Sequence, residues 1–247
     1  MGLGLLVGYL ATERRETLER LPALIRRTPA LASAALKYGV PYGKYAQTVK
    51  RFKAVNECLS AAQLKSHEEP QFLSEEQAFS CQMWGYSGIH HLRRLAAYSA
   101  LGRMLYVPER KRQEVSDAVV KEYYEVSADG ANTDLPYQHL MQHGDGQGMY
   151  LPQDFRRVVA PPKRYFDAVG GPIGSSFQLL KECQALAGII ELPLGLDIES
   201  SEIWDAADAP GKGALKWQQF GIESFSCIRL ARACERSIAT GAALVFC

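Results

Sequence analysis

The stretch that decides the fold lies at the C-terminus and reads ALKWQQFGIESFSCIRLARACERSIAT at residues 214–240, followed by Gly241 and AALVFC. Its first part predicts a long helix, because one stripe recurs at near-heptad spacing through Phe220, Cys227, Ala231, Cys234 and Ile238. The six closing residues predict a buried terminal strand. We expect the stripe to pack on the protein's own core; the alternative is a contact with a second chain.

The rest of the chain adds further helices and a change of texture. Helical periodicity recurs at residues 12–27, 44–63, 86–101, 109–126, 175–190 and 200–207. Ser74-Glu75-Glu76-Gln77 has the form of a capping box and predicts a helix start near Ala78. Gly and Pro become frequent from 130 to 174, which favours short strands and loops.

These patterns predict an α+β fold that is predominantly helical, with a small antiparallel sheet from the middle segment and the C-terminus. The length of 247 residues suits a single domain over 1–247. Within it we expect a helical half at about 1–128 and a mixed half at about 129–247.

The net charge of +1 hides an uneven distribution along the chain. Residues 1–112 hold 17 Lys/Arg against 9 Asp/Glu, whereas residues 113–247 hold 11 against 18. We expect the two halves to pack together and cancel. The alternative is a polarised molecule that steers a charged ligand or associates head to tail. The basic side of 44–63 has no interleaved aromatic residues to stack bases, so no nucleic-acid partner is expected.

The cysteines and the N-terminus indicate a cytoplasmic protein without a membrane partner. Six scattered cysteines without a CxxC pair suggest a reducing compartment. The apolar run GLGLLVGYLA at residues 2–11 is too short to span a bilayer, and no Lys or Arg precedes it as in a signal peptide.

The segment 137–155 carries the most suggestive polar residues. His139 and His143 are four residues apart, and Asp145 follows. On a helix the two imidazoles would share a face and could bind Zn or non-haem Fe, with the carboxylate as third ligand. The glycines at 144–148 favour a β-hairpin instead, which would separate the imidazoles by roughly 13 Å. In a hairpin, a single histidine can still act as an acid or base.

Two further clusters and one turn are candidate site residues. His67 and Glu68 lie between predicted helices, where they could line a cleft or simply form a solvated linker. His90 and Arg94 are one helical turn apart and could bind an anion together, although ordinary surface and core positions are the simpler interpretation. The run Gly174-Ser175-Ser176 opens a helix and could cradle an anion or supply a plain N-cap.

Three patches together resemble a group of uncharacterised bacterial proteins of similar length. They are HEEP at 67–70, HLMQHGDGQGMYLPQDF at 139–155 and GPIGSSFQLLKE at 171–182. The group has no known activity, so the resemblance implies no mechanism and only suggests that these patches belong together.

Two functions from different classes remain open on these residues. The first is an enzyme, hydrolase-like or otherwise, that uses a His/carboxylate cleft for acid–base or metal-assisted chemistry on a small anionic substrate. The second is a non-catalytic small-ligand-binding or adaptor protein that can be oligomeric. The clustering of histidines with acids favours the enzyme slightly.

Overall fold

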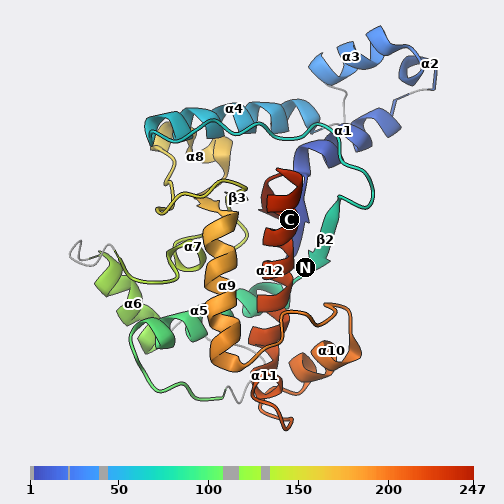
Figure 1. The fold of residues 1–247 in the computed structure, drawn as a ribbon. Coiled ribbons are helices and arrows are strands. Elements are labelled where there is room, and N and C mark those ends of the chain that lie inside the picture. Colours follow the sequence, from blue (N-terminus) through green and yellow to red (C-terminus); the bar gives the residue numbers. More distant parts are fainter. Residues whose placement is uncertain (1–2, 22, 39–43, 108–116, 129–133) are drawn as a thin grey trace.

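The computed structural model describes all residues except 1–2, 22, 39–43, 108–116 and 129–133 (Figure 1). In chain order the elements are β1 (Gly4–Val7), α1 (Tyr9–Glu19), α2 (Ala23–Arg26), α3 (Pro29–Tyr38), α4 (Tyr45–Ala61), β2 (Phe79–Gln82), α5 (Gly85–Ala100), α6 (Ala118–Ala128), α7 (Gln138–Met141), β3 (Met149–Leu151), α8 (Lys163–Val169), β4 (Ile173–Ser175), α9 (Ser176–Ile190), α10 (Ser201–Asp208), α11 (Lys216–Gln219), α12 (Gly221–Thr240) and β5 (Leu244–Phe246). The predicted α+β class, mostly helical with a small sheet, is confirmed.

The sheet has the strand order β2-β1-β5-β3-β4 and is mixed. β1 pairs antiparallel with β2 and β5, and β3 pairs antiparallel with β5 but parallel with β4. The prediction of a purely antiparallel sheet from the middle and the C-terminus was therefore incomplete. The apolar run at residues 2–11 contains β1, so the N-terminal half also contributes to the sheet.

Helices cover both faces of this sheet. Successive strand residues point to opposite faces, so neighbouring residues of one strand join different cores. Tyr150 and Leu244 join the larger core with residues of α5, α9 and α12. Met149 and Val245, their chain neighbours, join the smaller core with residues of α4. These neighbouring residues of β3 and β5 therefore connect the two helical layers through the sheet.

α12 is the central helix, and α5, α9 and α10 pack around it (Figure 1). It begins at Gly221 rather than at residue 214, because Phe220 leaves the helical conformation with φ −96° and ψ 46° and separates α12 from α11. Cys227, Ala231 and Cys234 are buried in the larger core. The stripe seen in the sequence therefore packs on the protein's own core, as expected.

The capping box at residues 74–77 forms but does not start a helix. The Gln77 backbone N–H donates to Ser74 Oγ at 3.3 Å, and the Ser74 N–H donates to Gln77 Oε1 at 3.0 Å. The chain then enters β2, which pairs with β1 from Phe79 onward. Strand pairing therefore overrides the local helix signal.

Most of the start of the predicted helix 109–126 lies outside the described residues, and α6 begins at Ala118. None of the described helices is long and apolar enough to cross a membrane.

Candidate functional site

Arg93 organises the segment that was predicted to hold the site. Its guanidinium donates to the backbone oxygens of Leu140 (3.1 Å) and His143, and it forms an ion pair with Asp145. His90 Nε2 lies 3.3 Å from the second oxygen of the same carboxylate. His90 and Asp145 are thus brought together, but around a buried arginine that fastens the 138–145 segment to α5.

His139 and His143 do not face one common point. The single turn of α7 ends at Met141, so His143 lies beyond the helix, and residues 134–148 form no strand. Neither a helix over both histidines nor a hairpin was therefore correct. His139 Nδ1 accepts from the Ser175 N–H at 2.9 Å, and its Nε2 donates to the Arg156 carbonyl at 3.1 Å. His143 Nε2 donates to the Met149 carbonyl at 3.1 Å. Within the described ranges, no three His, Cys, Asp or Glu side chains gather as a metal site would require.

Burial controls the protonation of both imidazoles. The His143 ring stacks on Tyr150 with the ring centroids 4.1 Å apart. Desolvation lowers the pKa of His143 to about 3 and also lowers the pKa of His139. Both are therefore neutral near neutral pH and serve as fixed hydrogen-bonding groups of the core.

We expect the buried His143 to make the protein acid-labile. The unfolded chain takes up a proton on His143 below about pH 6.5, but the folded chain does not until about pH 3, so stability falls as pH falls through this window. Between pH 7 and about 4.5 this loss should reach about 2–3 kcal/mol, and it should be smaller by that amount in His143→Gln. Urea unfolding at both pH values measures the difference. Glu182, whose pKa burial raises to about 7, titrates in both proteins and cancels. Identical pH dependence of the two proteins would contradict this assignment.

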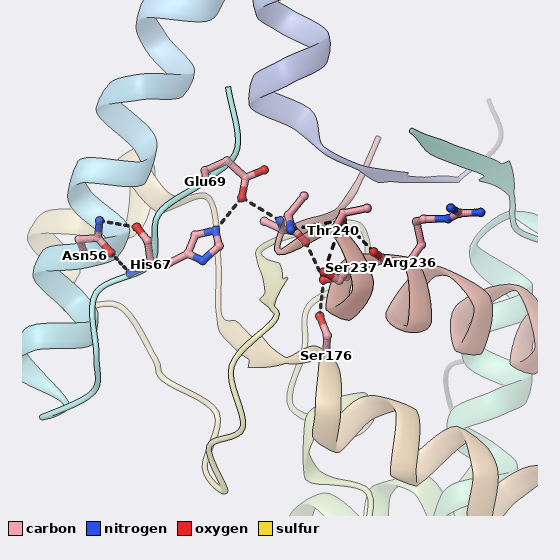
Figure 2. A network of polar contacts seen from close by, with 9 residues as sticks. Asn56, His67, Glu69, Ser176, Arg236, Ser237 and Thr240 are labelled. Atoms are coloured by element: carbon pink, nitrogen blue, oxygen red, sulfur yellow. Dashed lines mark hydrogen bonds and ion pairs between the residues drawn. The ribbon is translucent and has the colours of Figure 1, made fainter. Parts of the chain in front are cut away.

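His67 is buried, and its carboxylate partner is Glu69; Glu68, the acid predicted as a site residue, does not join the pair. Its Nε2 lies 2.6 Å from Glu69 Oε2, which also accepts from the Ala243 N–H at 2.8 Å, beside β5 (Figure 2). Asn56 on α4 fixes the backbone of His67 through two hydrogen bonds. Glu68 is exposed. The pair fastens the linker after α4 to the C-terminal strand, a contact that a local motif cannot indicate.

The Gly174-Ser175-Ser176 run is filled by protein atoms. Ser175 is the N-cap of α9, where its Oγ accepts from the Gln178 N–H at 3.2 Å. Ser176 Oγ bonds Ser237 Oγ at 2.8 Å, on the neighbouring α12 (Figure 2). A Cβ added at Gly174 would lie 2.4 Å from the Tyr150 ring. The N-cap interpretation fits these contacts.

Arg94 does not join His90 in a shared anion site. Its Nε lies 3.5 Å from Asp117, its Nη2 donates to the Tyr106 carbonyl at 3.1 Å, and its guanidinium covers the Tyr98 ring. His90 instead pairs with Asp145. The two side chains therefore have separate carboxylate partners.

Residues 191–208 form a strongly acidic surface that was not among the predicted site residues, and we call it the acidic segment. It has six acidic residues and no Lys or Arg. All six are exposed: Glu191, Asp197, Glu199, Glu202, Asp205 and Asp208. The absence of any basic residue over this length was visible in the sequence and could have identified it.

The buried face of α10 packs on α12 and holds the acidic segment in place. In α10 the residues Ile203, Ala206 and Ala207 are buried against α12, at the i, i+3 and i+4 positions of one face. Asp205 and Asp208 lie on the opposite side of the helix and Glu202 lies at the flank, and all three are exposed. The acidic helix is therefore amphipathic and cannot turn its carboxylates inward without exposing its core face.

Arg229 of α12 holds the loop before α10 through an ion pair with Glu199. Its guanidinium is fully buried, and Nη2 donates to Glu199 Oε1 at 3.1 Å. The cation lies 3.5 Å from the centroid of Phe225 and 5.1 Å from that of Trp204. Trp84 completes this aromatic cluster, 5.3 Å from Phe225. Burial lowers the pKa of Arg229, with the Glu199 carboxylate opposing the shift.

Three carboxylates of α10 advance along the helix axis by slightly more than DNA phosphates advance along the duplex axis, and each step also turns about 60° around the helix. Glu202, Asp205 and Asp208 are three residues apart, which corresponds to a rise of about 4.5 Å between successive positions of a helix. Phosphates of one DNA strand advance by about 3.4 Å along the duplex axis. The row can thus offer closely spaced negative charges to a basic surface.

Comparison with known proteins gives one match. No curated protein and no solved structure matches the chain. A family model described as "Putative DNA-mimic protein" matches residues 1–246. This finding overturns the prediction of a hydrolase-like enzyme acting on a small anionic substrate, and with it the small-molecule partner, because a protein that mimics DNA acts by being bound in place of DNA. Since the match extends over nearly the whole length, the chain belongs to the family described as "Putative DNA-mimic protein".

Proposed function

We propose that this protein is a non-catalytic DNA mimic that binds the DNA-binding surface of another protein through its acidic segment. The observation that carries the proposal is the set of six exposed carboxylates without a single Lys or Arg in residues 191–208. Family membership supports the same conclusion. The net charge of +1 means that the likeness to DNA must be local rather than spread over the whole surface.

The support beneath the segment favours this role. Surfaces that bind DNA carry Lys and Arg at positions set by the phosphates, so a mimic gains from carboxylates held in place before binding. Arg229 and the buried face of α10 provide that support. The eight residues of α10 extend about 12 Å, the axial length of three or four phosphates of one strand. A partner surface of this length corresponds to one recognition helix or one β-ribbon that enters a DNA groove.

A displacement assay tests the proposal. Purified DNA-binding proteins of the source organism, one with a recognition helix and one with a β-ribbon, are loaded with a fluorescent duplex, and the protein is titrated in. Release of the duplex from at least one of them is expected, with weaker competition as salt rises. Glu202→Gln/Asp205→Asn should compete about tenfold less well, a loss of about 1.4 kcal/mol.

The control removes the same charge elsewhere. Asp154 and Asp167 are exposed acids outside the acidic segment, and Asp154→Asn/Asp167→Asn should compete like the unaltered protein. Equal losses in the two double variants would show that total charge, and not the acidic segment, determines competition. If neither DNA-binding protein releases its duplex at any concentration, the proposed function is wrong for both classes.

A further inference from the structure

A groove on α1 has the opposite charge to the acidic segment. It is a cavity of about 170 Å³ between α1 and residues 71–78, and we call it the arginine groove. Its apolar lining includes Leu18, Phe72 and Leu73, and its charged residues are Arg14, Arg15, Arg26 and Glu19. Phe72 is 75% exposed, so a large aromatic side chain faces solvent beside three arginines. Aromatic and Arg side chains of this kind are enriched where proteins bind one another.

The two charged surfaces lie at opposite ends of the molecule. Figure 1 shows α1 and α4 at one end and α10 at the other. The arginine groove and the acidic segment therefore do not contact each other within one chain. A chain cannot place its own acidic segment in its own arginine groove, but a second copy can.

We propose that the arginine groove binds the acidic segment of a second copy of this chain, head to tail. Charge complementarity supports this occupant: three arginines and one glutamate face a segment with six acids. Glu191 and Glu199 already pair with Lys216 and Arg229, so the argument rests on the other four acids. Exposed apolar side chains accompany the charges on both sides, namely Phe72 at the groove and Trp204 on α10, which is 37% exposed. With a net charge of only +1, no overall repulsion keeps two copies apart.

The geometry of this contact has two consequences. A head-to-tail contact leaves one groove and one acidic segment unused in every pair, so assembly continues to longer species as concentration rises. Each contact also covers an acidic segment, and self-association would therefore limit the amount available to a DNA-binding protein. This second consequence rests on the proposed function, whereas the association itself does not.

Sedimentation velocity of the protein alone tests the association. In about 0.1 M NaCl the weight-average mass should rise with concentration above the 27.4 kDa of one chain, and in about 1 M NaCl, where the Debye length falls to about 3 Å, it should return to that value. Two charge-reversal variants, Arg14→Glu/Arg15→Glu and Glu202→Lys/Asp205→Lys, should each remain monomeric at low salt.

Mixing the two variants provides the decisive observation. The first keeps an intact acidic segment and the second keeps an intact arginine groove, so an equal mixture should associate although neither variant does so alone. The reversed groove and the reversed segment are also complementary in charge, so assembly in the mixture continues past the pair. A control pair of reversals on α8, Lys163→Glu/Arg164→Glu, changes the charge equally and should associate like the unaltered protein. Restored pairing also shows that both variants are folded.

Three results would overturn the proposal. The unaltered protein could remain a monomer at high micromolar concentration and low salt. The mixed variants could fail to pair although circular dichroism shows both to be folded. Finally, the protein could stay monomeric but bind a DNA duplex through Arg14 and Arg15, which would assign the groove to a nucleic acid instead. The monomeric Arg14→Glu/Arg15→Glu variant still carries the acidic segment. The displacement assay with this variant therefore tests the proposed function separately from self-association.

Discussion

Replacing Gly221 with Ala should destabilise the protein strongly and release α10 from α12. A Cβ at this position would lie 1.9 Å from the carbonyl oxygen and 2.2 Å from the carbonyl carbon of Ala206. These are backbone atoms, so the clash cannot be relieved by turning a side chain, and the start of α12 must move away from the end of α10. We expect a loss of at least about 1–3 kcal/mol, the range for overpacked cores.

Gly188 is the matched control for this substitution. It also lies in a helix, α9, but a Cβ there would have no atom within 4 Å. Gly188→Ala should therefore stabilise the protein by up to about 1 kcal/mol through helix propensity alone. Urea unfolding of the two variants measures the contrast. If Gly221→Ala is as stable as Gly188→Ala, the close contact between α10 and α12 does not exist in solution.

Removing Glu223 should have the second large effect. His91 on α5 and Glu223 on α12 form a fully buried pair, with Nδ1 and Oε1 3.1 Å apart. Glu223→Ala leaves the imidazole without its partner in the core, and breaking such a pair costs about 3–5 kcal/mol. The double variant His91→Leu/Glu223→Leu should lose less than Glu223→Ala, because it leaves no buried polar group unpaired.

An exposed ion pair gives the reference value for Glu223. Arg156 and Asp134 approach to 2.6 Å, but their side chains are 77% and 70% exposed. Asp134→Ala should therefore cost no more than about 1 kcal/mol. Denaturant unfolding of both single variants provides the comparison, and equal small losses would show that the His91–Glu223 pair does not hold α5 against α12.

The helices were predictable from sequence because their packing faces repeat locally. Apolar residues recur at helical spacing within α4, α5, α9 and α12, so a short window of the sequence is enough to detect each of these helices. β1 was hidden in an apolar run that resembles a targeting segment, and β2 followed a genuine capping box. Both strands depend on pairing with distant segments, and β5 joins β1 across nearly the entire chain. Local patterns carry no information about such partners.

The polar residues show the same limit. The sequence prediction placed His67, Glu68, His90, His139, His143 and Asp145 in one polar cleft. The structure brings His90 and Asp145 together, whereas His67 pairs with Glu69 and Glu68 is exposed. The rings of His139 and His143, however, bond backbone groups, and Asp145 bonds Arg93. Residue spacing alone cannot distinguish such contacts from a catalytic cluster. The acidic segment was visible as a charge pattern. Its importance emerged only once the fold showed that α10 is amphipathic and supported by Arg229.

The most direct test of the central claim is the footprint of a displaced DNA-binding protein on this chain, measured by hydrogen–deuterium exchange. The monomeric Arg14→Glu/Arg15→Glu variant should be used, so that self-association does not contribute to the protection. We predict that binding slows exchange in residues 191–208 and that excess duplex DNA reverses this protection. Protection confined to other segments, or a complex that persists unchanged in the presence of excess duplex, would contradict the claim that the acidic segment takes the place of DNA.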